Sequence, residues 1–253
     1  MYSRLTELID LYRLKIKGVI HIGGHYGEEY PSYRSSGIKR FLFIEPIPDN
    51  FRRMVDTFRS DFPDIEEFPA ALDVTNTKLD LHLIALNIAL GNTAGKFPMF
   101  VETANQSQSC SLLKPKKHLE QYPHITFDDQ IEITLNKLDN LTFDKNLNAI
   151  SIDVQGFELE VFKGGINTIS RQIDYIYSEV NRDELYEGCP MVEELDAFLS
   201  DSGFVRVICD WVGGTWGDAL YMKQHLAPNP TMQKILPLRF SRWGKKIWKL
   251  MGR

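Results

Sequence analysis

The sequence predicts an α/β protein in which helices cover both faces of a central, mostly parallel sheet and an antiparallel hairpin closes one side. Two observations lead to this fold class. Short β-branched and aromatic runs alternate with amphipathic segments of helical period along residues 17–203, and this alternation is typical of parallel sheets with right-handed crossovers. The last two strand-like runs, 205–209 and 220–223, instead flank a glycine-containing turn at 210–218, which predicts the hairpin.

Composition narrows the class of protein. The 253 residues are 43% hydrophobic and 25% charged, enough to bury a sizeable core. A formal net charge of -5 disfavours nucleic acid as a partner. The cysteines Cys110, Cys189 and Cys209 have no metal-binding spacing, so we expect reduced thiols in a cytoplasmic protein. Residues 1–14 are too charged for a secretory signal, and no apolar run reaches the roughly 20 residues of a membrane span.

The N-terminal half is expected to begin with a packing helix within residues 1–16, because its apolar residues fall on one helical face. A strand at 19–22 leads through glycines to a helix at about 28–35. A second strand at 40–44 leads to a helix at about 51–59, capped by Asp49 or Asn50. Residues 79–90 fit one or two strands, and both Ala71 and Ala89 are candidates for the strand end near the ligand.

The second half is expected to hold strands at 97–101, 131–136, 149–152 and 173–178, with helices from 158 and over 191–202. Residues 103–111 form a polar loop without charges that either lines a cleft or is simply solvated. We expect one domain over residues 17–225, followed by a basic amphipathic tail at 226–253.

The tail differs in composition from the rest of the chain. Residues 232–253 carry seven basic side chains and no acid, interleaved with tryptophan, isoleucine and leucine. This pattern fits either an interfacial helix that makes weak contact with an anionic membrane surface, or a helix that packs its aromatic side chains on the domain or frays at the terminus. We favour the second interpretation, packing or fraying, over membrane contact.

The segment KGVIHIGGHYGEE at residues 17–29 is the first candidate for a ligand site. A first strand that turns sharply through glycines is where open α/β sheets bind nucleotide-like ligands. We expect Gly23 and Gly24 to leave room for the ligand. Glu45 follows the second strand, 22 residues after Gly23, and an acid at this spacing is placed to accept hydrogen bonds from ribose hydroxyls.

Two further acids follow later strands. Asp153 ends the strand at 149–152 and Glu179 ends the next one, so both are expected at the same sheet edge as Gly23 and Glu45. The chain lacks the GxGxxG pattern that favours a dinucleotide and the GK[ST] of a P-loop. S-adenosylmethionine (SAM) fits better, because it has a ribose but no phosphate.

Several ordered motifs in residues 17–223 resemble the FkbM family of SAM-dependent methyltransferases. They are IHIGGHYGEE, FIEPIPDNF, IALGNTAGK, SIDVQGFELEVFKGG and DWVGGTWGDALY. The resemblance implies a Rossmann-like class I methyltransferase fold and SAM as cofactor. It also favours Ala89 over Ala71 as the strand end near adenine. The chain departs from many members at His21 and at Gly24-His25, and its segment 61–86 is unusual for the family.

The resemblance implies methyl transfer, usually to oxygen, on a sugar, glycan or natural-product scaffold. Because a hydroxyl acceptor must lose its proton as it attacks, we expect the catalytic residues to be Asp153, Glu179 and His25. The cofactor-binding residues that it implies are His21, Gly23, Gly24, His25, Glu28, Glu45, Ala89 and Asp153. Asp153 and Glu179 could also bind Mg²⁺, but two carboxylates at a sheet edge are commonly just cleft walls, so no metal site is predicted.

The acceptor is the least determined part of the prediction. Trp211, Trp216, Tyr186 and the loop at 103–111 either line a sugar-sized pocket or serve ordinary packing. A non-catalytic SAM- or glycan-binding protein remains the alternative to an enzyme. An NAD-dependent reductase and a methyltransferase of proteins or small carboxylates are weaker readings, and the sequence does not fix the oligomeric state.

Overall fold

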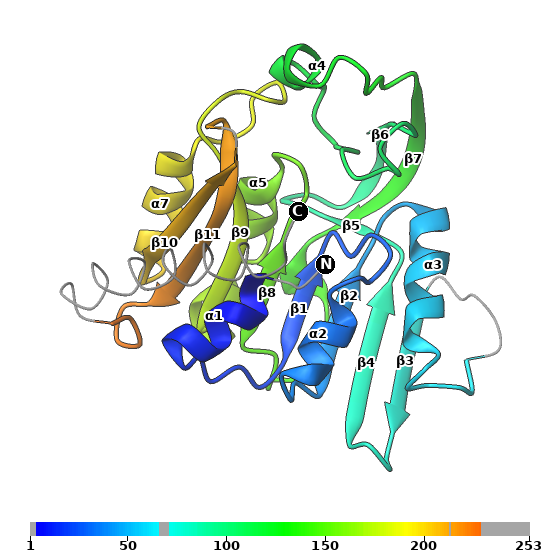
Figure 1. Cartoon of the computed structure of the whole chain (residues 1–253), viewed down its shortest axis with the longest axis vertical. Coiled ribbons are helices and arrows are strands. Elements are labelled where there is room, and N and C mark those ends of the chain that lie inside the picture. The colour runs from blue at the N-terminus through cyan, green and yellow to red at the C-terminus, as the bar shows by residue number, and fades with distance from the viewer. Residues whose placement is uncertain (1–3, 66–70, 213, 229–253) are drawn as a thin grey trace, which may run out of the picture.

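The structure, a computed structural model (Figure 1), describes residues 4–65, 71–212 and 214–228. It confirms the predicted α/β class. The helices are α1 (Arg4–Tyr12), α2 (Tyr30–Ser35), α3 (Pro48–Phe58), α4 (Lys117–Gln121), α5 (Glu158–Gly164), α6 (Ile166–Gln172) and α7 (Val192–Asp201), with a short 3-10 helix at Leu138–Asn140. The strands are β1 (Val19–Ile22), β2 (Arg40–Ile44), β3 (Ala71–Asn76), β4 (Leu81–Leu86), β5 (Ala89–Leu90), β6 (Gly95–Val101), β7 (Asp129–Asn136), β8 (Ala149–Ile152), β9 (Tyr175–Asn181), β10 (Phe204–Val212) and β11 (Trp216–Lys223).

The main sheet has eight strands in the order β10-β11-β9-β8-β1-β2-β4-β3. Its central pairs, from β9 through β8, β1 and β2 to β4, are parallel. The carboxyl ends of β1, β2, β8 and β9 therefore meet at one edge. The predicted hairpin is present as β10 and β11, which pair antiparallel with each other, and β11 pairs antiparallel with β9.

The region that the sequence left open contains two strands of the main sheet. β4 lies parallel to β2, and β3 pairs antiparallel with β4 as an edge strand. A second, small sheet in the order β5-β7-β6 was not predicted. Because its strands pair with one another and with no strand of the main sheet, it forms a separate layer, which lies with α4 above the carboxyl edge in Figure 1.

Each face of the main sheet has its own apolar core. Successive side chains of a strand point to opposite faces, so Phe41 and Phe43 of β2 pack with α1, α2 and α3. Leu42 and Ile44 pack with α5, α6 and α7 on the other face. Both cores consist mainly of fully buried aliphatic and aromatic side chains, which fixes the positions of the strand ends that build the site.

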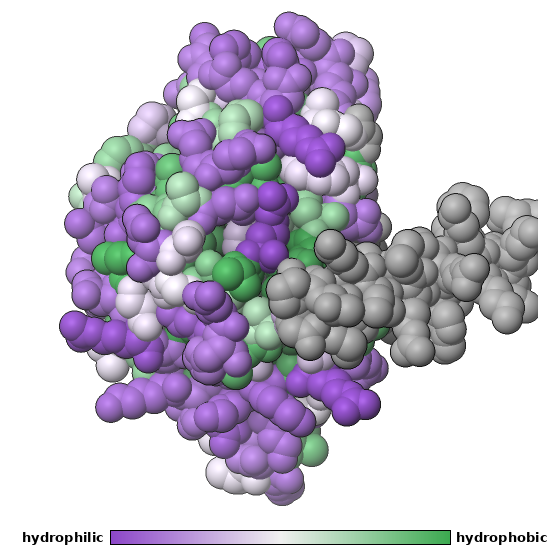
Figure 2. Space-filling model, turned by 90° about the vertical axis from the view of Figure 1, so that its left-hand side faces the viewer, coloured by the Kyte–Doolittle hydropathy of each residue, from purple (hydrophilic) through white to green (hydrophobic). Residues whose placement is uncertain are grey.

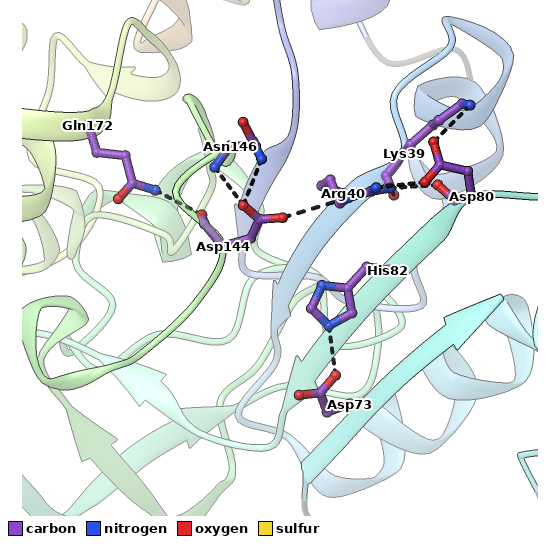
Figure 3. Close-up of polar contacts among 8 residues, drawn as sticks. All are labelled: Lys39, Arg40, Asp73, Asp80, His82, Asp144, Asn146 and Gln172. Atoms are coloured by element: carbon purple, nitrogen blue, oxygen red, sulfur yellow. Dashed lines mark hydrogen bonds and ion pairs between the residues drawn. The ribbon is translucent and has the colours of Figure 1, made fainter. Parts of the chain in front are cut away.

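Polar contacts hold the opposite edge of the sheet together (Figure 3). Arg40 at the start of β2 donates to the Asp80 carboxylate at 2.7 Å and pairs with Asp144 at 3.6 Å. His82 of β4 lies 2.7 Å from the Asp73 carboxylate of β3. These contacts join the amino ends of β2 and β4 to edge strand β3, to the turn between β3 and β4, and to the loop before β8.

The described surface is mainly polar. Figure 2 shows one face on which hydrophilic residues predominate and apolar ones are scattered. Leu79, Leu119 and Leu226 are the large hydrophobic side chains exposed within the described ranges. None of the helices in those ranges has the length and apolar character that crossing a membrane requires. The predicted basic tail lies almost entirely outside the described residues.

Candidate active site

The glycine turn after β1 is held against two neighbouring elements. The N–H groups of Gly23 and Gly24 both donate to the Ile44 carbonyl at the end of β2, at 3.0 and 2.9 Å. A Cβ on Gly23 would lie 1.9 Å from the Asp153 carbonyl oxygen, and one on Gly24 would lie 2.5 Å from the Met54 sulfur. The Cβ positions of these glycines are therefore occupied by protein atoms, and the turn needs glycine so that α3 and the residue after β8 can approach.

Gly23→Ala should therefore destabilise the fold and disturb the site. Gly23 has a φ of +84°, which an alanine tolerates poorly, and the added methyl group overlaps the Asp153 carbonyl. We expect a loss of about 1–3 kcal/mol in the free energy of unfolding, measured by urea denaturation. Gly37→Ala is the matched control, because Gly37 also has positive φ but its Cβ would meet nothing within 4 Å. Equal losses in the two variants would contradict the packing argument.

Glu45 is held at the end of β2 by backbone donors. Its side chain is only 4% exposed. The carboxylate accepts the N–H of His25 at 2.8 Å through Oε2 and the N–H of Ile47 at 2.9 Å through Oε1. Burial raises the Glu45 pKa to about 7, although these hydrogen bonds act in the opposite direction. Each carboxylate oxygen keeps a further lone pair, so it can accept a hydrogen bond from a hydroxyl group of a ligand.

The raised pKa of Glu45 predicts how its contribution to the free energy of unfolding changes with pH. A carboxyl group whose pKa is about 7 in the folded protein and 4.5 in its ordinary, solvated state stabilises the folded state most below the lower value. Because the folded chain binds more protons between the two values, that contribution is lost as pH rises through about 7. We expect Glu45→Gln to reduce the fall in unfolding free energy between about pH 5 and about pH 8 by up to about 3 kcal/mol. Urea denaturation of the wild-type and variant proteins at both pH values measures this change. A variant with the same pH dependence as the wild type would contradict the assignment of the raised pKa to Glu45.

Glu45 lies in the wall of a pocket, called here the first pocket, above the carboxyl ends of β1, β2 and β8. Apolar side chains make up most of the wall, which suits a flat purine, while a few polar groups suit a ribose and a charged tail. The lining residues are Ile22, Gly23, His25, Ile44, Glu45, Pro46, Ile47, Asn50, Ala89, Leu90, Met99, Ser107, Cys110, Leu112, Asp153, Val154 and Phe157.

His25 joins the glycine turn to the polar loop at 103–111. Its Nδ1 lies 2.8 Å from Glu28 Oε1, and its Nε2 lies 2.8 Å from the Gln106 carbonyl. Burial alone would lower the His25 pKa, but the hydrogen bonds to Glu28 and Gln106 raise it overall. Through these two contacts His25 ties the glycine turn to the loop at 103–111 beside the first pocket, and its role in catalysis stays a prediction.

Three acids form one cluster: Asp153 directly after β8, Glu158 at the start of α5 and Glu179 near the end of β9, of which Glu158 and Glu179 are buried. One oxygen each from Asp153, Glu158 and Glu179 lies within 4.8 Å of the other two. Burial, and then the nearby Asp153 charge, raise the Glu179 pKa well above its ordinary value. Burial also raises the Glu158 pKa to about 7. A divalent cation would relieve the repulsion in such a cluster, but protonation of Glu158 and Glu179 relieves it as well.

Gln155 positions two of these carboxyl groups. Its Nε2 donates to Asp153 Oδ1 at 2.8 Å and to Glu179 Oε2 at 3.1 Å. Its Oε1 lies 2.8 Å from the Tyr186 hydroxyl, which donates either to it or to the Ser109 carbonyl. Gln155 also has a φ of +54°, an uncommon conformation for glutamine, so the turn after β8 is built to present these side chains.

Asp153 and Glu179 also line a second pocket, which lies between the main sheet and the segment around α4. Its wall combines amides, carboxyl groups, imidazoles and aromatic rings. The lining residues are Asn105, Gln108, His118, Tyr122, His124, Ile125, Asp153, Gln155, Glu179, Leu185 and Trp216. Asp153 is the one residue in both linings. The two pockets therefore meet at a carboxylate.

The structure places the remaining predicted residues as follows. Ala89 lines the first pocket, whereas Ala71 lies on edge strand β3 and is exposed. His21 does not line either pocket, because its ring is buried against Phe43 and its Nδ1 lies 2.9 Å from the Tyr33 hydroxyl. Glu28 lines neither pocket and contacts the His25 ring instead. Trp216 lines the second pocket, while the Trp211 ring contacts the Arg182 guanidinium at 3.6 Å.

Sequence reasoning missed Gln155, Met99 and His118 as site residues. Gln155 lies in the SIDVQGFELEVFKGG motif, two residues after Asp153. That position at a strand end could have identified it as a site residue. Met99 belongs to the small sheet and His118 belongs to α4. The positions of both elements depend on contacts between distant residues, which leave no local pattern in the sequence.

The first pocket fits SAM. Glu45 and the apolar wall at Ala89 and Met99 suit a nucleoside. Asn50 lines the same pocket, is 3% exposed, and its side-chain amide lies beside Glu45, where it acts against the rise in pKa that burial causes. A buried amide and a carboxyl group together offer donors and acceptors to ribose hydroxyls. These residues would hold the adenosine part, and Asp153 lies at the end nearest the second pocket.

Comparison with known proteins places the chain in a family. Residues 21–206 match the methyltransferase FkbM domain. A 116-residue stretch is 34% identical to the 2-O-methyltransferase NoeI of Sinorhizobium fredii, and the match covers 44% of this chain and 46% of NoeI. The crystal structure of methyltransferase FkbM from Methylobacillus flagellatus superposes with a TM-score of 0.53 at 14% identity, covering 81% of this chain and 43% of that one.

These matches carry different weight. Both named proteins are more than twice as long as the part that aligns with this chain. At 14% identity the structural match supports the fold alone. The domain match, by contrast, spans most of the main sheet, the first pocket, and every lining residue of the second pocket except Trp216. It confirms the expected cofactor, SAM, and the expected family. The chain belongs to the FkbM methyltransferase family.

Proposed function

We propose that the protein is a SAM-dependent O-methyltransferase whose acceptor is a hydroxyl of a sugar, as part of a glycan or a glycosylated natural product. The observation that carries the proposal is the position of Asp153, which lines both pockets. A carboxylate at the junction of a donor site and an acceptor site is placed to act at the transferred group. The 34% identity to a 2-O-methyltransferase over 116 residues supports oxygen as the acceptor atom.

In this proposal the first pocket binds the cofactor and the second binds the acceptor. SAM, when bound, supplies the methyl group. Asp153 accepts the proton of the attacking hydroxyl, because it is the exposed member of the acid cluster and faces both pockets. Glu179, whose pKa is raised well above its ordinary value by burial and by the Asp153 charge, favours the protonated form. Gln155 fixes the orientation of both side chains.

The second pocket supports a sugar as the acceptor. Sugar hydroxyls bind amide and carboxyl groups, while the C–H faces of the ring pack on aromatic side chains. Asn105, Gln108 and Glu179 supply the first kind of group, and Tyr122 and Trp216 supply the second. The Trp216 indole N–H donates to the Tyr122 hydroxyl at 3.2 Å, so the two rings are held together in the pocket wall.

The proposal is tested by supplying SAM with a trideuterated methyl group together with a panel of methyl glycosides of the common hexoses and deoxyhexoses. We expect mass spectrometry to find the labelled methyl group on one hydroxyl of at least one glycoside. Glycerol and serine serve as controls, because they carry hydroxyl groups without a sugar ring. Binding of SAM by calorimetry without transfer to any glycoside would contradict the enzyme and favour a SAM- or glycan-binding protein.

A further inference from the structure

The second pocket contains a histidine for which the proposed reaction has no role. His118 lies in α4 and is 3% exposed. Its ring packs against the rings of Tyr122, Phe127 and Tyr186, with centroids 5.1, 5.3 and 5.4 Å away. Its Nδ1 has no hydrogen-bond partner among the residues that the structure describes. The ring is thus fixed by packing while its polar atom is left unpaired.

An unpaired buried nitrogen costs free energy that a ligand can recover. Burial lowers the His118 pKa, and nearby His124 acts in the same direction, while the Glu102 charge opposes both. The imidazole is therefore neutral near pH 7, and a neutral imidazole has one nitrogen that accepts a hydrogen bond and one that donates. Such a group suits a sugar hydroxyl, which can both donate and accept.

The helix that carries His118 is fixed to the body of the protein. The N–H groups of Lys116 and His118 both donate to the Leu185 carbonyl, at 2.8 and 3.1 Å. Lys117 pairs with the Asp183 carboxylate at 2.5 Å. The Gln121 side chain at the end of α4 accepts from the Thr215 hydroxyl at 2.9 Å. These contacts tie α4 to the segments after β9 and before β11, so the imidazole has a defined position over the pocket.

The position of His118 separates it from the reacting hydroxyl. It lines the second pocket but not the first, whereas Asp153 lines both. We propose that His118 binds the sugar acceptor through a hydroxyl other than the one that is methylated, and so selects and positions the ring that the enzyme accepts. This inference rests on the proposed function. It makes His118 a positioning and specificity residue rather than the base.

His118→Phe tests the inference because it keeps a ring of similar size in the aromatic packing and removes both nitrogens. The probe is the methyl glycoside that the wild-type protein methylates best. We expect its KM to rise about tenfold or more, with kcat changed less than about threefold and the SAM affinity unchanged. His118→Asn restores a polar atom near the position of Nδ1, and His118→Gln restores one near the position of Nε2. At least one of these variants should recover part of the loss in KM.

His82→Phe is the matched control, since His82 pairs with Asp73 on the far part of the sheet (Figure 3). An unchanged KM in a folded His118→Phe protein would overturn the inference and leave the proposed function standing. Saturation-transfer NMR with the same glycosides and S-adenosylhomocysteine separates the two claims. Glycoside binding that His118→Phe abolishes would support the inference even without turnover. A wild-type protein that binds none of the glycosides would overturn it.

Discussion

Asp153→Asn should lower turnover by about a hundredfold to ten-thousandfold, the range that a positioned general base contributes. Asparagine has the shape of aspartate but cannot take the proton of the attacking hydroxyl. Asp153 is exposed, and Gln155 can rotate its amide to donate or accept at an asparagine, so we expect normal folding. The SAM affinity should change little, because Glu45 and the apolar wall of the first pocket are untouched.

The measurement is kcat with the trideuterated SAM assay, together with calorimetry and a thermal melt of the same protein. Asp201→Asn is the control, since Asp201 is an exposed acid at the end of α7 and outside both pockets. Turnover within a few-fold of wild type in Asp153→Asn would remove Asp153 as the base and shift that role to another group of the cluster. A loss of SAM binding would instead make it a cofactor ligand.

Glu45→Gln should weaken SAM binding by about tenfold to a hundredfold, because hydrogen bonds to a charged acceptor contribute about 1.5–3 kcal/mol. The glutamine keeps the size of the side chain but replaces one acceptor oxygen with a donor. In the wild-type protein the backbone N–H groups of His25 and Ile47 both donate to the carboxylate. The new donor in the variant would therefore face one of these N–H groups. The variant should therefore also melt at a lower temperature near pH 5, where the protonated native side chain is most favourable.

Isothermal calorimetry with SAM measures this loss directly. Asp49→Asn is the control, because Asp49 is an exposed acid in the first turn of α3, four residues after Glu45. An unchanged dissociation constant for Glu45→Gln would remove the ribose role and leave Glu45 as a residue that only holds the glycine turn.

The parts of the fold that the sequence predicts are those with strong local patterns. β1, β2, β8 and β9 are short runs of buried β-branched and aromatic residues, so their existence and order follow from hydrophobic pattern alone. The acids that end them, Glu45, Asp153 and Glu179, could be placed at one edge because parallel strands end together. The closing hairpin followed from two strand-like runs around a turn with three glycines.

The second pocket could not be predicted in the same way. It depends on α4 and the loop at 103–111, which are held by contacts between distant residues, such as the His118 N–H with the Leu185 carbonyl and the Tyr186 hydroxyl with the Ser109 carbonyl. Histidine and glutamine in a polar stretch give no period that marks them as buried. The close approach of the Asp153 carbonyl to Gly23 also could not be predicted, because it joins residues 130 positions apart in the sequence.

The most direct test of the account is a crystal structure of the protein with S-adenosylhomocysteine and the preferred methyl glycoside. The account predicts ribose hydroxyls on the Glu45 carboxylate, the adenine against Ala89 and Met99, and the sulfur facing Asp153 with the glycoside beyond it in the second pocket. A nucleoside bound elsewhere, or a sulfur turned away from the second pocket, would contradict the claim that the two pockets meet at the reacting atoms.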